Sequence, residues 1–327
     1  MVFLAIWWAW MGHTWFASAF DTDDTPYRLK VLLQMIGVLV LAAGVERAFE
    51  HQDFGLITLG YVIMRVGLVA GWLRAARADT AVRRTARRYA LGIALLQVFW
   101  IGLLAVPAHL WIYGWGVLIV LELLVPWWAE GAGNTPWHPH HISERYGLLT
   151  IIVIGESVLA STLAIQSAVD FGSLPASLLQ VIVSAPIILF AMWWLYFSQP
   201  GHAVLSSSRR AFLWGYGHFF VFASAAAVGA ALAVVADHAI GRTEISDLQA
   251  GMAMAIPVAS YLLSVWFVQI RPQPDDVICG RLFLIATVAV LVAPLTPFAV
   301  PVIAGILALT TALVVVSVDR RSRASLA

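Results

Sequence analysis

Long apolar segments, separated by short polar stretches, run along the whole chain of 327 residues. Most approach the length of about 20 residues that an α-helix needs to cross a bilayer. The pattern predicts eleven such segments, at approximately 1–19, 29–49, 54–74, 89–106, 109–127, 146–168, 176–197, 211–236, 250–270, 280–294 and 298–318. The loops between them are too short for a soluble catalytic domain, so we expect any chemistry to lie within or beside the membrane.

The last two segments are the least regular. Pro294, Pro297 and Pro301 interrupt what is otherwise one continuous apolar run. Proline at membrane depth is tolerated where a helix kinks or re-enters the bilayer, as well as between two spans. The sequence therefore leaves open whether 280–318 forms two spans or a broken helix.

Composition makes the same prediction. Hydrophobic residues make up 61% of the chain and charged residues 11%, whereas soluble domains carry roughly 25% charged residues. So few charges cannot cover a water-facing surface, and we expect an all-α polytopic membrane protein. The single cysteine, Cys279, excludes an intrachain disulfide and a cysteine-based metal site.

The basic residues are distributed unevenly between the loops. If the loop 75–88 lies in the cytoplasm, sixteen of the nineteen arginine and lysine residues fall on that side, while Arg47 and Arg242 fall opposite and Arg65 lies within a segment. Cytoplasmic loops of membrane proteins carry the excess of positive charge. We therefore expect a plasma-membrane protein with its C-terminus in the cytoplasm and its N-terminus outside, which requires an odd number of spans.

Two charged residues lie deep within predicted spans. Arg65 is eleven residues beyond Phe54, where its segment begins, and Glu156 is about ten residues into the sixth segment. A rise of about 1.5 Å per residue places both near the middle of the bilayer. A charge at that depth needs a partner or a wet cavity. We expect Arg65 and Glu156 to pair, either as a structural tie or as a site that contacts a solute.

Three more ionisable residues fall in the cytoplasmic halves of their segments, Glu122, His218 and His13. A carboxylate and two imidazoles at similar depth suit a proton relay or a polar vestibule. Each could equally be a hydrogen-bonded core residue. Their common depth is the reason to group them with Arg65 and Glu156 as a candidate ion or substrate pathway.

A cluster of three histidines, His138, His140 and His141, precedes Glu144 at the cytoplasmic end of the sixth segment. His140 and Glu144 are four residues apart, the spacing of one helical face. A zinc-binding HExxH motif is missing, however, and Pro139 interrupts the cluster. We favour a loop packed by imidazoles over a metal site, and keep these residues as secondary candidates.

No glycine-rich phosphate loop, catalytic triad or nucleic-acid-binding patch stands out. We accordingly expect no cofactor, no metal and no nucleic-acid partner. The expected partners are the lipid bilayer and an unidentified small solute or ion, and the oligomeric state stays open.

Several blocks of the sequence together resemble the bacterial low-temperature-requirement A family. The most specific is Glu-Arg-Tyr-Gly-Leu-Leu-Thr-Ile-Ile-Val-Ile-Gly-Glu-Ser, within 141–160, and the resemblance covers nearly the whole chain. Further blocks are 7–10 through 21–24, 40–44, 61–65 and 193–197. The resemblance implies a bacterial inner-membrane protein but no substrate, because the family is named after a growth phenotype.

The resemblance also implies a missing first helix. Members of the family begin with a further span that carries an acidic, phenylalanine-rich motif, which is absent here, so we expect this chain to be N-terminally truncated. Twelve spans would permit a six-plus-six repeat, with 1–130 as the first half and 131–327 as the second. Trp7-Trp8 and Trp193-Trp194 would then occupy corresponding helices of a parallel repeat.

Three functions remain open at this point. The favoured one is a secondary transporter or carrier for a small solute, with Arg65 and Glu156 at its site. A membrane sensor or scaffold without transport is the second. The third is a membrane-embedded enzyme that modifies lipid, with the histidine cluster and Glu144 as its active groups, so enzymatic activity is uncertain and less expected than its absence.

Overall fold

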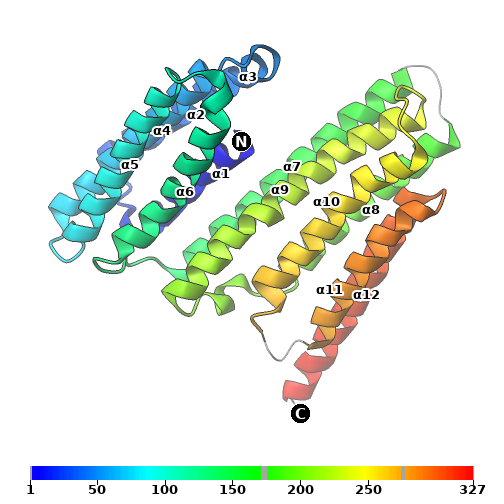
Figure 1. Cartoon of the computed structure of the whole chain (residues 1–327). Coiled ribbons are helices and arrows are strands. Elements are labelled where there is room, and N and C mark those ends of the chain that lie inside the picture. The colour runs from blue at the N-terminus through cyan, green and yellow to red at the C-terminus, as the bar shows by residue number, and fades with distance from the viewer. Residues whose placement is uncertain (1, 171–174, 274–276, 327) are drawn as a thin grey trace. The chain divides into compact units, whose positions relative to one another are not determined.

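The structure is a computed structural model that describes residues 2–170, 175–273 and 277–326 (Figure 1). Within these ranges it contains helices and no strand. They form two compact units, 1–142 and 143–327. The α-helices are α1 (Val2–Phe20), α2 (Thr25–Ala43), α3 (Val45–His51), α4 (Gly55–Ala78), α5 (Arg83–Leu103), α6 (Trp111–Glu130), α7 (Pro139–Asp170), α8 (Ala176–Phe197), α9 (Ser208–Ala239), α10 (Asp247–Val265), α11 (Val277–Val292) and α12 (Ala299–Leu326).

Each predicted apolar segment is a helix in the structure, and α3 is a short continuation of the second segment beyond Gly44. In the described part of the chain, nine helices are long and apolar enough to cross a membrane. The helices α1 and α5 fall outside these nine because tryptophans and His13 lower the hydropathy of α1 and four arginines begin α5. The prediction of an all-α polytopic membrane protein is confirmed.

The proline-rich region near the C-terminus forms two helices. A single 3-10 turn, Ala293–Leu295, separates α11 from α12, and the two helices lie side by side in Figure 1. Pro294 falls in the turn, and Pro301 falls in the first turn of α12, where a missing N–H removes no helical hydrogen bond. Two separate helices, each long enough to span, therefore replace the broken helix that the sequence left open.

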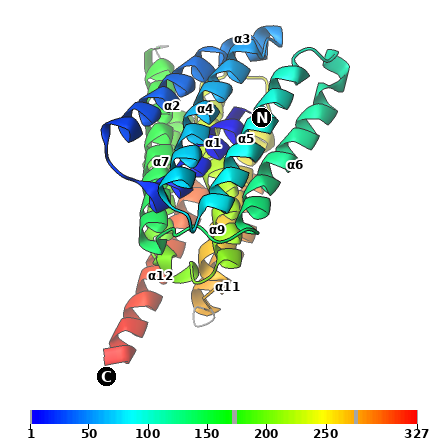
Figure 2. The ribbon, with the colours of Figure 1, turned by 90° about the vertical axis from the view of Figure 1, so that its left-hand side faces the viewer.

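In the first unit, α4 is the central helix. It packs against α1, α2 and α5, and α6 packs in turn against α5 (Figure 2). The approach of α2 to α4 is especially close, because glycines face each other there. A methyl group on Gly60 would overlap backbone atoms of Leu41 and lie 2.5 Å from the carbonyl oxygen of Gly37. Small residues allow this close contact between membrane helices.

Polar contacts tie the helices of the first unit together at both of its ends. Asp24 caps α2, accepts a hydrogen bond of 2.9 Å from the Tyr27 N–H and pairs with Arg74 at the end of α4. The Arg74 guanidinium holds the pKa of the Asp24 carboxyl well below its usual range. At the same end, Thr85 donates a hydrogen bond of 2.8 Å to the Gly133 carbonyl oxygen. Arg47 lies at the opposite end, where it pairs with Asp53.

In the second unit, α9 packs mainly against α10, and α8 packs against α12. The last turn of the α10 segment is a π-helix, Trp266–Ile270. The expected six-plus-six repeat stays a prediction, since the packing inside each unit does not establish an internal symmetry.

The close contact between α2 and α4 yields a testable prediction. We expect Gly60→Ala to lower the free energy of unfolding by about 1–3 kcal/mol, because an extra methyl group in a packed interface forces the backbone to shift. Gly116→Ala on α6 is the matched control, because a methyl group there has no neighbour among the described residues. Alanine favours a helix over glycine by up to about 1 kcal/mol, so the control should be neutral or stabilising.

The measurement is unfolding by sodium dodecyl sulfate in mixed micelles, followed by circular dichroism. Equal stability of Gly60→Ala and Gly116→Ala would show that the glycine contact does not set the spacing of the two helices.

A candidate functional site formed by a buried carboxylate and an aromatic pocket

Arg65 lies in the middle of α4, on the face that α4 turns toward the interior of the first unit. Its side chain is 3% exposed. Tyr61, one turn earlier on the same face, accepts a hydrogen bond of 2.6 Å from Arg65 Nη2. The guanidinium carbon lies 4.8 Å from the centroid of the Tyr61 ring. The same Nη2 donates to Glu122 Oε2 at 2.9 Å, so the predicted mid-span arginine has a carboxylate partner.

Glu122, on α6, is the centre of this arrangement. Its side chain is 5% exposed, and its two oxygens accept hydrogen bonds from five side chains. Oε2 accepts from Trp8 Nε1 at 2.8 Å and from Arg65, whereas Oε1 accepts from Tyr61 Oη at 3.2 Å, Trp100 Nε1 at 3.2 Å and Gln97 Nε2 at 3.3 Å. Residues of α1, α4, α5 and α6 thus converge on one carboxylate, which we call the Glu122 cluster.

The Glu122 cluster is nearly saturated with hydrogen bonds. Two buried polar atoms at its edge, Arg65 Nε and Gln97 Oε1, have no hydrogen-bond partner among the described residues. Removing a charge from water costs several kcal/mol, and an ion pair inside a protein often does no more than offset that cost. The pair is therefore weak evidence for a purely stabilising role.

The predicted partner of Arg65 was wrong. We expected Glu156 from its depth, but Arg65 pairs with Glu122. The predicted fifth segment ended at 127, whereas α6 continues to Glu130, which moves Glu122 toward the middle of its helix and to the level of Arg65. Glu156 is an exposed residue of α7 in the second unit.

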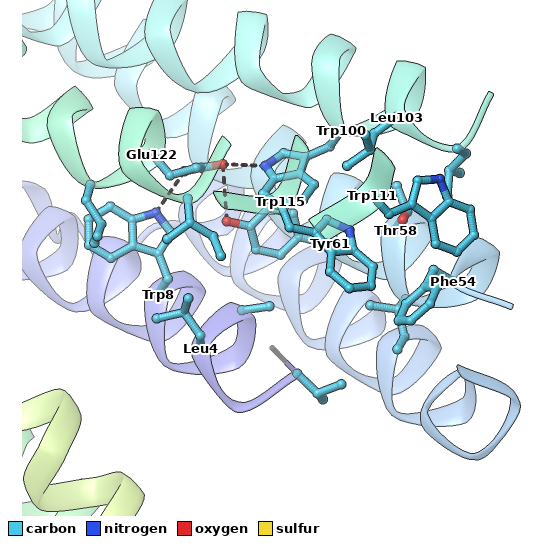
Figure 3. A pocket seen from close by; sticks show the side chains of 16 residues that line it. Leu4, Trp8, Phe54, Thr58, Tyr61, Trp100, Leu103, Trp111, Trp115 and Glu122 are labelled. Atoms are coloured by element: carbon cyan, nitrogen blue, oxygen red, sulfur yellow. Dashed lines mark hydrogen bonds between the residues drawn. The ribbon is translucent and has the colours of Figure 1, made fainter. Parts of the chain in front are cut away.

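A pocket of about 100 Å³ adjoins the Glu122 cluster (Figure 3). It extends between α1, α4, α5 and α6 from Glu122 toward Phe54 and Trp111, at the end of the unit opposite Arg74. Figure 3 shows Trp8, Tyr61 and Trp100 hydrogen-bonded to Glu122 at one end of the pocket. The lining contains six aromatic side chains, namely Trp8, Phe54, Tyr61, Trp100, Trp111 and Trp115.

The other two residues of the predicted pathway, His13 and His218, are not among the five donors to Glu122. His13 is a half-buried residue of α1 in the first unit. His218 is fully buried in the second unit, where Nδ1 lies 2.7 Å from the Trp214 carbonyl oxygen and Nε2 lies 3.1 Å from Tyr196 Oη. Both ring nitrogens of His218 therefore have partners of their own, and a relay that joins it to Glu122 stays a prediction.

The histidine cluster lies at the end of the first unit and the beginning of α7. The rings of His138 and His141 are 5.3 Å apart, and the His138 N–H donates to Ser18 Oγ at 3.0 Å. His140 lies beside them in the first turn of α7, and Glu144 is exposed. Among the described residues, no group of three histidine, cysteine, aspartate or glutamate side chains is arranged to hold a metal ion.

Four members of the Glu122 cluster were absent from the predicted site, namely Trp8, Tyr61, Gln97 and Trp100. Two of them carried a usable signal. Tyr61 precedes Arg65 by one helical turn, and Gln97 interrupts an otherwise apolar segment. The tryptophans carried none, because tryptophan is common throughout this chain, which contains 15.

The buried pair predicts strong energetic coupling. We expect Glu122→Gln and Arg65→Met each to lower the free energy of unfolding by about 3–5 kcal/mol, because each leaves the other member of the pair buried without its opposite charge. The double variant should cost less than the sum of the two. The half-exposed Asp24–Arg74 pair is the control, and Arg74→Met, which leaves the Asp24 cap of α2 in place, should cost much less than either substitution in the buried pair. Additive effects of the Arg65 and Glu122 substitutions would contradict the coupling.

Comparison with known proteins supplies the family. Residues 1–318 match the model of the bacterial low temperature requirement A protein. The chain is also 26% identical, over 330 residues, to a protein of Rhizobium meliloti (strain 1021) described as "Uncharacterized protein RA0937". That match covers 94% of this chain and 78% of the relative. No solved structure matches the chain. Since the family model spans most of its length, the chain belongs to the bacterial low temperature requirement A family.

Proposed function

We propose that this membrane protein is a carrier for a small solute, and that the solute binds in the aromatic pocket beside the Glu122 cluster. The observation that supports the proposal most directly is the contact between an ion pair and a cavity. Arg65 and Glu122 are paired at 2.9 Å in the middle of two helices, and Glu122 also lines the pocket. Ionisable residues inside a membrane commonly mark the pathway of a substrate or an ion.

The position of the pocket fits a carrier. Transporters place their sites near the middle of the bilayer, where helices present polar groups to a cavity. The pocket reaches Glu122 from one end of the first unit, and α4, α5 and α6 continue beyond it toward the end that carries Arg74. A pocket that extends from Glu122 to one end of the unit, with packed helices toward the other end, is what one state of an alternating-access cycle requires.

A sensor or scaffold is the second candidate. A closed core with no cavity beside the Arg65–Glu122 pair would favour a sensor or scaffold. The pocket that Glu122 lines argues against that function. Nothing observed among the described residues specifically favours a lipid-modifying enzyme at the histidine cluster.

The proposed setting is the bacterial inner membrane with the C-terminus in the cytoplasm. Within the first unit, Arg74, Arg83 and Arg88 lie at the end formed by the 79–82 loop and the 131–138 segment, while Arg47 lies at the other end. Loops rich in arginine and lysine stay in the cytoplasm. In this orientation the pocket extends from Glu122 toward the outer face.

The orientation is tested with single cysteines in a Cys279→Ser background. We expect Glu50→Cys to react with an anionic, membrane-impermeant methanethiosulfonate only from the outer side of oriented vesicles, and Thr80→Cys only from the inner side. Both residues are exposed and lie at opposite ends of the first unit. Reaction of Glu50→Cys from the inner side would reverse the proposed orientation.

Transport is tested with a third cysteine, Thr58→Cys, which lies in the pocket lining. A carrier must expose its site to each side in turn, so we expect Thr58→Cys to react with a cationic, membrane-impermeant methanethiosulfonate from the outer side and, more slowly, from the inner side. The reagent is cationic because Glu122 lines the same pocket. Glu50→Cys and Thr80→Cys serve as controls for leakage. Reaction of Thr58→Cys from one side only, under every condition, would support a sensor or scaffold and overturn the carrier.

A further inference from the structure

We propose that the pocket beside the Glu122 cluster binds a small organic cation with apolar substituents, such as a quaternary or protonated tertiary amine. The inference rests on the proposed function in one respect, because it names the class of solute that the carrier would move. The argument for a cation comes from the pocket lining alone. Three properties of the lining support it: the aromatic rings, the sign of the charge and the size.

The first property is the number of aromatic rings in so small a space. Phe54, Trp111 and Trp115 form one group, with ring centroids 4.9–6.0 Å apart, and Trp115 lies edge-on to Phe54 at an angle of 69°. Tyr61, Trp8 and Trp100 form the other end (Figure 3). The face of an aromatic ring carries negative charge density and attracts cations, tryptophan most strongly. Clusters of such rings are typical of sites for quaternary ammonium groups.

The second property is the sign of the charge that the pocket presents. Among the described residues, Glu122 is the only charged residue in the lining, whereas Arg65 pairs with it from outside the lining. The ion pair therefore turns its negative end toward the pocket. Trp8, Tyr61, Gln97 and Trp100 are neutral donors, so they hold the carboxylate in place without cancelling its charge.

Other classes of solute fit this lining less well. An anion would meet the carboxylate and the faces of the rings, which both repel it. A sugar would need many hydrogen-bond partners, but the indole N–H groups of Trp8 and Trp100 are taken by Glu122 and that of Trp111 by the Val106 carbonyl oxygen. Buried polar groups without partners cost free energy, so a highly polar neutral solute is disfavoured.

The third property is size. The pocket of about 100 Å³ is smaller than the cavity of about 150 Å³ that binds benzene in an engineered protein. It has room for an ammonium group with methyl substituents, which contains fewer heavy atoms than benzene, rather than for a large lipophilic cation or an acyl chain. Methyl groups would contact the rings, and the positive centre would lie toward Glu122.

The experiment is a binding titration on the purified full chain in detergent micelles, followed by tryptophan fluorescence and by isothermal titration calorimetry. The probes are two cations, tetramethylammonium and choline, and one neutral compound, 3,3-dimethyl-1-butanol, which has the shape of choline without its charge. All are titrated at constant ionic strength. We expect saturable binding of tetramethylammonium and choline, and at least tenfold weaker binding of the neutral isostere, because the isostere lacks the charge that the rings and Glu122 attract.

Two variants locate the site. Trp115→Leu removes a lining ring that has no hydrogen bond to Glu122, and we expect it to weaken binding of tetramethylammonium at least fivefold. Trp127→Leu is the matched control, because Trp127 lies on the same helix, is 71% exposed and is outside the lining. It should bind like the unaltered protein. Equal effects of the two variants would place binding outside the pocket.

The outcomes separate this inference from the carrier proposal. If choline and its isostere bind equally, or neither cation binds, the cationic class is overturned whether or not Thr58→Cys reacts from both sides. If the cations bind in the pocket but Thr58→Cys reacts from one side only, the cation site stands and the carrier proposal fails.

Discussion

The arrangement of the first unit depends on one desolvated carboxylate. Glu122 lies among apolar helices, where an isolated charge would cost several kcal/mol, and three other helices must bring their donors to it. Arg65 supplies the opposite charge, and Trp8, Tyr61, Gln97 and Trp100 supply neutral hydrogen bonds. The requirement to satisfy Glu122 thus fixes how α1, α4, α5 and α6 are rotated about their axes, and the same rotation places the aromatic rings around the pocket.

The helix that carries Arg65 has little freedom to move away. The glycine contact between α2 and α4 brings the two backbones together, and α5 and α1 cover other faces of α4. A rigid α4 keeps the guanidinium within 2.9 Å of the Glu122 carboxylate. The outer part of the pocket is lined by residues at the ends of helices, Phe54, Leu104 and Trp111, and the Phe54 and Trp111 rings pack against each other there.

Membership of the low temperature requirement A family does not by itself name an activity, and the one relative described above is uncharacterised. The chemistry of the site must therefore carry the functional argument. The pocket is aromatic, small and negatively charged at the end formed by Glu122. These three properties together favour a small organic cation with apolar substituents over an anion or a sugar. The second unit has a buried polar group of its own at His218, and both of its ring nitrogens have partners, the Trp214 carbonyl oxygen and Tyr196 Oη.

The sequence alone determined the class of fold and the positions of the helices, because the length and hydropathy of each span are local properties that the bilayer imposes on the chain. It also located Arg65 as a buried charge that needs a partner. Only the tertiary structure decided that the partner is Glu122 and not Glu156, since depth along a helix does not say which helices are neighbours or how each is rotated. The tryptophans that complete the site were likewise hidden, because a residue type spread through the whole chain becomes informative only when packing brings particular copies to one carboxylate.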